Sequence, residues 1–343
     1  MNNQDLRAVK KGLKGLSLQD KTCLVTGGCG FIGSWLCHFL VSDGADVICV
    51  DNLSSGLEEN ISSLRDRENF TYIHHDITTP LPLDLPLDYV IHTASRASPM
   101  EFSRYPVEIL SSNTLGTLVA IELARKHRAG FLFTSTSEVY GNPVVVPTPE
   151  TYIGQFNHLG PRGCYDEGKR AGETIALAYS MQFDVDVRIA RIFNTFGPRM
   201  RYDGIYGRVI PRFIDQAIHN HPITICGDGT QTRSFCYISD LIIGLLRMIQ
   251  IPECSGKIVN LGNPEERQII QVASLIKSVT GSQSAFTFWP ERPDDPLRRC
   301  PDITRARSLL GWEPVMKFED GIKRMMDDVY KNIHSSIPQK FNY

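Results

Sequence analysis

A strand-like run, a glycine-rich turn and a helical pattern follow one another in TCLVTGGCGFIGSWL, which begins at residue 22. Glycines at this turn let backbone amides at the helix N-terminus approach a pyrophosphate closely. The glycines alone are weak support, because an ordinary strand-to-helix turn uses them too. Asp51, at the end of the next predicted strand, supplies the remaining context of a dinucleotide fingerprint. We therefore predict a dinucleotide-binding turn that contains Gly27, Gly30, Phe31, Ile32 and Gly33.

The predicted cofactor is NAD. An acidic side chain at position 51 can bond both ribose hydroxyls and would repel a 2′-phosphate, which disfavours NADP. Asn52 follows this acid, and two further pairs follow the third and fourth predicted strands. These pairs are predicted to contact the cofactor, although ordinary loop chemistry explains them equally well. They are Asp76 with Ile77, and Ala94 with Ser95.

Short apolar runs alternate with helical patterns up to residue 194, which is typical of a doubly wound parallel sheet. The sequence thus predicts a Rossmann-like α/β fold with six or seven strands. The predicted strands are 22–26, 46–52, 70–76, 88–95, 130–136 and 186–194, and the predicted helices are 31–44, 106–127 and 165–182.

The regular alternation stops near residue 197, where segments punctuated by glycine and proline begin. A chain of 343 residues exceeds what one typical core supports, so a second lobe is expected. We predict an NAD-binding domain at 21–197 and a smaller, mainly substrate-binding C-terminal lobe at 198–334, with interleaved boundaries. Residues 1–20 and the tail 335–343 are expected to be weakly structured.

Charge and cysteine usage exclude several classes of protein. The chain has 36 Lys and Arg against 38 Asp and Glu, so its charge of −2 favours neither nucleic acid nor an anionic membrane. The nine cysteines are scattered without a C-x-x-C pair, which indicates reduced, mostly buried thiols and no metal site. Because no run of 18 apolar residues appears, we expect no membrane span and a cytoplasmic location.

Polar residues follow the predicted strand GFLFTST, at the sheet edge where α/β proteins keep their ligands. They are Thr136, Ser137 and Glu138. Downstream, Tyr165 and Lys169 are four residues apart, so a helix places both on one face. The ammonium would then lower the phenol's pKa and make it a usable base. A solvated helix face is the alternative for this pair taken alone.

Together these motifs resemble an extended short-chain dehydrogenase/reductase, with Thr136, Tyr165 and Lys169 as its catalytic residues. The 4,6-dehydratases of that family carry Asp-Glu where this chain has Ser137-Glu138, and the galactose-type 4-epimerases usually have small or hydroxyl side chains there. STSEVYG, GPRGCYDEGKR, RIFNTFGPRM, GDGTQTRSF, VNLGNPEE, RRCPDI and LGWEP resemble the UDP-glucuronate decarboxylase family from residue 22 to about 330.

The resemblance implies that UDP-glucuronate is oxidised at carbon 4, decarboxylated and reduced to UDP-xylose. It places Ser137, Glu138 and Arg299 around the substrate's carboxylate, because Arg299 aligns with the arginine of the family's Arg-Lys-Pro motif. Arg299 would orient this group, while Glu138 either disfavours the anion or relays a proton. A surface salt bridge from Arg299 to Asp294, Asp295 or Asp302 is the alternative.

The UDP moiety is expected to contact Asn194, Arg208 and Arg233, since guanidinium groups suit two phosphate charges. Arg233 is the best candidate, although GDGTQTRSF also fits a simple hairpin. Arg96 stands where the family commonly has proline, which places a cation beside the predicted nicotinamide pocket or just outside it, with either tighter carboxylate binding or a changed substrate as the expected result. Ser98 is another expected substrate contact. The segment 201–207 is about two residues longer than the family shows, which affects the uracil side.

Other readings of the sequence are a uronate 4-epimerase, a dehydratase that uses Glu138 alone, and a non-catalytic NAD-binding scaffold or sensor.

The resemblance also implies a homodimer that packs residues 106–127 and 165–182 into a four-helix bundle. Burial against the sheet explains the apolar positions of these helices equally well. Those positions are Leu110, Leu118, Ile121, Leu123, Ile175, Leu177 and Tyr179.

Overall fold

The structure is a computed structural model that describes residues 3–155, 157–201, 208–291 and 296–335. Its centre is a seven-stranded parallel sheet with the strand order β11-β6-β5-β4-β1-β2-β3. The predicted doubly wound, Rossmann-like sheet is confirmed. Its strands are β1 (Thr22–Thr26), β2 (Asp46–Asp51), β3 (Phe70–His74), β4 (Tyr89–His92), β5 (Gly130–Thr136), β6 (Val187–Ile192) and β11 (Lys257–Leu261).

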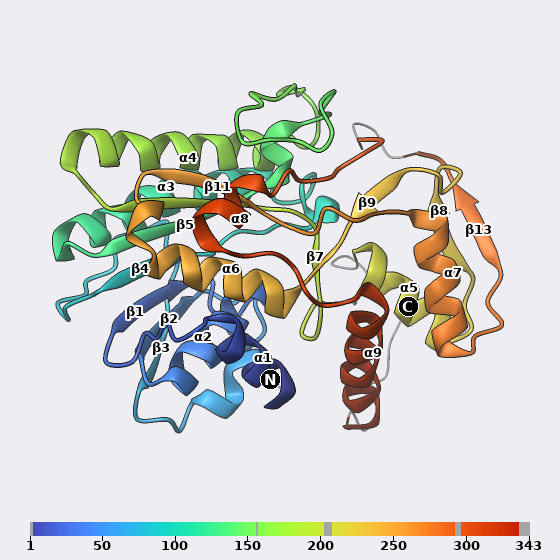
Figure 1. The fold of residues 1–343 in the computed structure, drawn as a ribbon, viewed down its shortest axis with the longest axis horizontal. Helices are drawn as coiled ribbons and strands as arrows, with labels where there is room; N and C mark the ends of the chain where they lie inside the picture. The colour runs from blue at the N-terminus through green and yellow to red at the C-terminus, as the bar shows by residue number, and fades with distance from the viewer. Residues whose placement is uncertain (1–2, 156, 202–207, 292–295, 336–343) are drawn as a thin grey trace.

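Helices cover both faces of this sheet, as Figure 1 shows. On one face, α3 (Pro106–His127) and α4 (Gly163–Phe183) pack against each other and against β4 and β5. On the other face lie α2 (Phe31–Asp43) and α6 (Ile238–Gln250). All seven residues of β5 are buried, which explains the nearly continuous apolar run in its sequence. The shorter helices near the sheet are η1 (Glu58–Leu64), η2 (Pro99–Glu101), η3 (Ser137–Tyr140), η5 (Pro252–Cys254) and α8 (Thr304–Leu310).

Within the described residues, α3 is the one helix long and apolar enough to cross a membrane, with a mean hydropathy of 1.2 over its best window. Its length and composition are also those of a core helix. Ile109, Ala120 and Ile121 are fully buried in the layer that α3 forms with α4 over the sheet. Its apolar character is therefore explained by packing within the fold.

The C-terminal lobe consists of short strand pairs and three helices, seen beside the sheet in Figure 1. β8 and β9 pair with different strands, so the alternative of a simple hairpin at GDGTQTRSF is not what forms. The predicted interleaving is present, because α6 and β11 return from this part of the chain to the main sheet. The lobe's elements are β7 (Thr195–Phe196) with β10 (Cys236–Tyr237), β8 (Ile223–Cys226) with β13 (Phe286–Trp289), β9 (Thr232–Ser234) with β12 (Glu266–Gln268), and α5 (Val209–Ile218), α7 (Ile269–Thr280) and α9 (Phe318–Ser335).

The prediction that residues 1–20 are weakly structured is wrong. Residues Asn3–Gly12 form α1, which packs on α6. Leu13, like Val9 and Leu18, is buried, and Arg247 of α6 donates a hydrogen bond to the carbonyl of Gly12. An amphipathic helix gains most of its stability from such packing rather than from its own propensity. Of the predicted tail 335–343, Ser335 ends α9 and residues 336–343 lie outside the described residues.

All nine cysteines are free, and seven of them are buried. Burial raises the pKa of the thiol of Cys23 to about 12, so this group is protonated at neutral pH. The expectation of reduced cysteines that act as small apolar core residues agrees with this arrangement.

Docking of the N-terminal segment can be tested with Leu13→Ala, in the turn that directly follows α1. Truncating this buried leucine should lower the free energy of unfolding by about 2–5 kcal/mol, because it leaves a cavity in the core to which this segment contributes. Chemical denaturation measures the change, and Lys10→Ala, at an exposed position of α1, is the control. Equal stability of the two variants would show that α1 does not dock.

Candidate active site

A cavity of about 770 Å³ opens at the carboxyl ends of the central strands and extends to the C-terminal lobe. The structure brings together every residue predicted for the cofactor, the chemistry or the substrate, because all of them line this one cavity. Parallel strands end at the same sheet edge, so residues far apart in sequence converge there. Their individual roles stay predictions. The segment 202–207, where an insertion was predicted, lies outside the described residues.

The glycine-rich turn leaves no room for side chains. Gly27 has a positive φ of 69°, and a Cβ there would lie 2.7 Å from the Cα of Ala94. A Cβ on Gly33 would collide with the carbonyl of Gly27. Gly30 is the N-cap of α2 and supplies no capping side chain, so the first amides of this helix face the cavity. This backbone cradle fits the pyrophosphate of a dinucleotide.

Asp51 lies at the end of β2 and is buried. Its carboxylate accepts hydrogen bonds from the backbone amides of Cys29, at 2.9 Å, and Leu53, at 2.8 Å. Burial raises the pKa of this carboxyl above its ordinary value, and the two amide bonds oppose the rise. The adjacent Asn52 donates to the carboxylate of Asp76 at 3.2 Å, so these two predicted cofactor contacts form one group.

Thr136, Tyr165 and Lys169 meet at the end of β5. Tyr165 stacks on Phe102 at a centroid distance of 5.1 Å, and Lys169 Nζ donates to the carbonyl of Thr134 at 2.8 Å. Burial raises the pKa of Tyr165 to about 12, opposed by Arg208 and by a hydrogen bond with Thr136.

The expectation that Lys169 lowers the pKa of Tyr165 below its ordinary value is therefore wrong for this arrangement. Both side chains are buried, and desolvation disfavours the charged form of each group. Burial lowers the pKa of Lys169 to about 7, so its own ammonium is only partly retained at neutral pH. The phenol needs a further positive charge nearby to act as a base.

Glu138 lies between two arginines. Arg299 binds one oxygen of its carboxylate and Arg162 binds the other. Burial opposes the charge of this group, but the two guanidinium groups prevail and hold the pKa of Glu138 at about 2. The alternative of a surface salt bridge for Arg299 is not seen with Asp302, and Asp294 and Asp295 lie outside the described residues.

Sequence reasoning missed Arg162. Its signal is the arginine of GPRGCYDEGK, four residues before an acidic side chain in the first turn of α4. The i, i+4 spacing predicts an ion pair there, and the structure gives one to Asp166 with a distance of 3.6 Å between Nε and Oδ2. The second partner, Glu138, comes from a different element and cannot be inferred from spacing.

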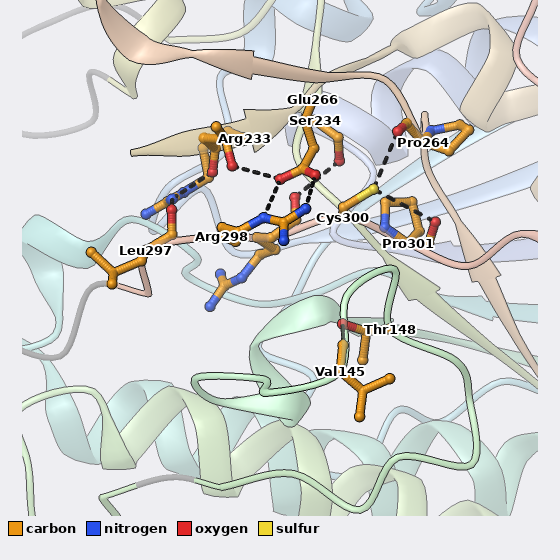
Figure 2. Close-up of polar contacts among 12 residues, drawn as sticks. Val145, Thr148, Arg233, Ser234, Pro264, Glu266, Leu297, Arg298, Cys300 and Pro301 are labelled. Atoms are coloured by element: carbon orange, nitrogen blue, oxygen red, sulfur yellow. Dashed lines mark hydrogen bonds and ion pairs between the residues drawn. The ribbon is translucent and has the colours of Figure 1, made fainter. Parts of the chain in front are cut away.

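The two arginines of the C-terminal lobe are fixed by strand-like pairing. Residues 297–299 lie along β9, with the amide of Thr232 donating to the carbonyl of Leu297 at 3.0 Å. β12 pairs with the other edge of β9. Glu266 of β12 also accepts from the hydroxyl of Thr232, at 2.5 Å. Its carboxylate pairs with Arg298, as Figure 2 shows. Backbone pairing on both edges of β9 thus positions Arg233 and Arg299, which line the cavity.

Arg233 and Arg208 approach the cavity from β9 and from the start of α5. Arg233 donates to the carbonyl of Thr232 at 2.8 Å, and Arg208 donates to that of Ala97 at 2.8 Å. Asn194 is also at the cavity, and its side-chain NH2 is buried without a hydrogen-bond partner in the described part of the chain. Such a donor needs a partner from a ligand or water.

Arg96 does not add an unbalanced cation. It forms an ion pair with Glu101, which is fully buried in η2, and lies over the ring of Tyr105 at 4.3 Å. The expected change in carboxylate binding therefore has no direct electrostatic basis. Ser98, also predicted to contact substrate, is buried at the cavity wall.

Comparisons with known proteins give consistent results. The model of the NAD dependent epimerase/dehydratase family matches residues 23–262. UDP-glucuronic acid decarboxylase 1 of Danio rerio is 48% identical over 313 residues, which cover 91% of this chain and 73% of that protein. UDP-glucuronic acid decarboxylase 6 of Arabidopsis thaliana is 41% identical over 318 residues, 92% of this chain and 90% of that protein.

A solved structure is also similar. UDP-glucuronic acid 4-epimerase from Bacillus cereus, in complex with UDP-glucuronic acid and NAD, superimposes with a TM-score of 0.82 and 29% sequence identity. The match covers 91% of this chain and 99% of that one. The chain therefore belongs to the NAD-dependent epimerase/dehydratase family and, within it, to the UDP-glucuronic acid decarboxylases.

Proposed function

We propose that the chain is an NAD-dependent UDP-glucuronate decarboxylase, which forms UDP-xylose through a 4-keto intermediate. The observation that carries the proposal is the meeting of two groups in one cavity. Thr136, Tyr165 and Lys169 can handle protons at a carbinol, and Glu138 with Arg299 forms a charged site beside them. The names of relatives that are 41–48% identical support the same reaction.

The residues present fit NAD. The glycine turn accommodates a pyrophosphate, Asp51 suits a ribose without a 2′-phosphate, and the cavity continues from there to Tyr165. When bound, NAD supplies the acceptor for two electrons, returns them to the same sugar, and brings a positive ring charge near the buried phenol. This charge provides what Tyr165 lacks in the protein alone.

The chain's own residues then move protons. Tyr165 takes the proton of the sugar's 4-hydroxyl, and Thr136 shares the hydrogen bond to this oxygen. Oxidation at carbon 4 gives a β-keto acid. The ketone accepts the electron pair of the bond between carbon 5 and the carboxylate as carbon dioxide leaves. Tyr165 and Thr136 stabilise the resulting enolate oxygen, and carbon 5 is protonated before carbon 4 is reduced again.

Arg299 is suited to orient the substrate's carboxylate. Its side chain is buried, and its Nε–H has no hydrogen-bond partner among the described residues. With a pKa of about 2, Glu138 is an anion at neutral pH. It therefore has no proton to give, which supports a role in repelling the carboxylate over a role as a proton relay.

The diphosphate of the UDP moiety is assigned to Arg233 and Arg208, with Asn194 as a neutral donor. Arg233 is buried and held by backbone pairing, whereas Arg208 is exposed at the mouth of the cavity. A fixed guanidinium loses little conformational entropy on binding a phosphate. This difference supports Arg233 as the stronger contact.

A UDP-uronate 4-epimerase is the alternative supported by a specific observation, the similarity to the Bacillus cereus enzyme. Release of carbon dioxide from UDP-glucuronate separates the two reactions. A dehydratase would have an acid at position 137, where this chain has Ser137. Exchange of tritium at carbon 4 of the sugar would eliminate a non-catalytic scaffold.

A homodimer through α3 and α4 is part of the proposal. The outer faces of these helices expose apolar side chains that the sheet does not cover. Leu110 is 43% exposed, Leu115 50%, Leu118 37% and Met181 85%.

Nine free cysteines support a reducing, cytoplasmic location, which imaging of a fluorescent fusion can test.

Replacing Asp51 with asparagine should reduce the preference for NAD over NADP by about tenfold. The neutral amide keeps an oxygen for the backbone amides but no longer repels a 2′-phosphate. Titration calorimetry gives both dissociation constants, and their ratio is insensitive to a general loss of stability. The exposed Asp46→Asn is the control, and an unchanged ratio in Asp51→Asn would contradict the assignment.

Tyr165→Phe should lower the rate of carbon dioxide release by about 10²- to 10⁴-fold, because the base at the 4-hydroxyl is lost. The rate is measured with UDP-glucuronate labelled in its carboxyl group, and mass spectrometry identifies UDP-xylose. NAD binding and melting temperature should change little. Tyr179→Phe on the same helix is the matched control, and substantial turnover by Tyr165→Phe would refute the mechanism.

Leu115→Glu should convert the dimer into a monomer, because a carboxylate buried in an apolar interface without a partner is strongly unfavourable. Light scattering after size-exclusion chromatography gives the mass. Val315→Glu, at a position 77% exposed between α8 and α9, should leave the mass unchanged. A dimer that survives Leu115→Glu would place the interface elsewhere.

A further inference from the structure

Four charged or titratable side chains form a group beside Tyr165, and three of them line the cavity, whereas Asp166 lies behind Arg162. Glu138 comes from η3, Arg162 and Asp166 from the start of α4, and Arg299 from the segment that pairs with β9. Arg162 links the group, because it binds Glu138 and also lies 3.6 Å from Asp166. The two arginines contribute two positive charges and Glu138 one negative charge, so the protonation of Asp166 decides the net charge of the four side chains.

Asp166 is poorly placed to carry a negative charge. Its side chain is buried, and its Oδ1 has no hydrogen-bond partner in the described ranges. The distance of 3.6 Å from Oδ2 to Arg162 Nε exceeds that of a normal hydrogen bond. Arg162 instead makes its close contact with Glu138. A buried carboxylate with neither oxygen well bonded is unfavourable, whereas a protonated carboxyl is tolerated.

The electrostatic surroundings agree with this geometry. Burial raises the pKa of Asp166 to about 7, the negative charge of Glu138 adds to the rise, and Arg162 and Arg299 oppose it. The charged and titratable groups that face Asp166 are these three, together with Cys164 and Tyr165 on its own helix. Both of these neighbours have raised pKa values and stay neutral near pH 7.

We propose that Asp166 is a specificity-determining residue, whose proton gives the subsite for the substrate's carboxylate one net positive charge. While Asp166 is protonated, the two guanidinium groups exceed Glu138 by one charge, and a single uronate carboxylate balances it. When Asp166 ionises, the subsite is already neutral before the substrate enters. Asp166 acts on the substrate's carboxylate through Arg162, with which it pairs, and does not need to touch the sugar.

This inference rests on the proposed function, because it concerns recognition of a uronate. It predicts the direction in which the affinity for the uronate changes with pH. Below about pH 7, Asp166 holds its proton and the subsite attracts the carboxylate. As the pH rises through this value, the attraction is lost. UDP-xylose, which has no carboxylate, should be indifferent to the change.

The test uses the NAD-loaded Tyr165→Phe protein, in which turnover is blocked, with and without Asp166→Asn. Dissociation constants of UDP-glucuronate and UDP-xylose are measured from about pH 6 to about pH 8.5, on either side of the pKa of Asp166. In the parent, affinity for UDP-glucuronate should fall about tenfold relative to UDP-xylose. In Asp166→Asn, the amide is neutral throughout, so high affinity should persist at the upper pH.

Lys169 also titrates near pH 7, and its effect is present in both proteins. The informative quantity is therefore the difference between the two pH profiles. Glu167→Gln is the matched control, because Glu167 is a half-buried neighbour on α4 that pairs with Arg170. Its profile should match that of the parent. Identical profiles for the parent and Asp166→Asn would overturn the inference.

A second measurement keeps the inference testable if Asp166→Asn does not fold. A ratio of the two affinities that stays constant across this pH range in the parent alone would be sufficient to refute it. The proposed function is judged separately, by carbon dioxide release from the wild-type protein. Uronate binding with the expected pH profile but without carbon dioxide release would reject decarboxylation and retain the role of Asp166.

Discussion

The ion pair between Glu138 and Arg299 joins the two parts of this chain at the wall of the candidate active site. Glu138 stands at the end of β5 in the central sheet, and Arg299 comes from the segment that pairs with β9 in the C-terminal lobe. Both side chains are largely shielded from water, so the pair depends on accurate placement of each element. Backbone pairing of β9 on both edges provides this placement for Arg299.

Four titratable groups near this pair are buried, with different outcomes for their protonation. Glu138 remains an anion because two guanidinium groups bind its oxygens, whereas Asp166 has its nearest guanidinium at 3.6 Å, lies near the like charge of Glu138 and has a raised pKa. Tyr165 and Lys169 are both shifted toward their neutral forms. Desolvation is common to all four groups, and only the number and distance of their charged partners differ. In the protein alone, Tyr165, Asp166 and Lys169 are thus shifted toward their neutral forms, and charged ligands would add to the charge of the site.

The sequence predicted the parts of this site that depend on local geometry. Gly27 and Gly33 were identifiable because only glycine fits the tight turn, and Tyr165 and Lys169 because helical spacing aligns them. The involvement of Asp166 was not predictable, because an Arg and an Asp four residues apart look like an ordinary solvated pair. The group they belong to includes Glu138 of η3 and Arg299, and Arg299 follows more than a hundred residues later in the chain.

The docking of α1 escaped prediction for the same reason. The apolar residues of this segment, such as Val9 in α1 and Leu13 just after it, are few, and α6, on which α1 packs, follows over two hundred residues later. α6 in turn is buried nearly throughout, because it lies between the sheet, α1 and α8. A helix that is buried on nearly all sides requires cover on its outer face, and α1 provides part of it. The N-terminal helix is therefore a part of the sheet domain's core, on the face opposite to α4.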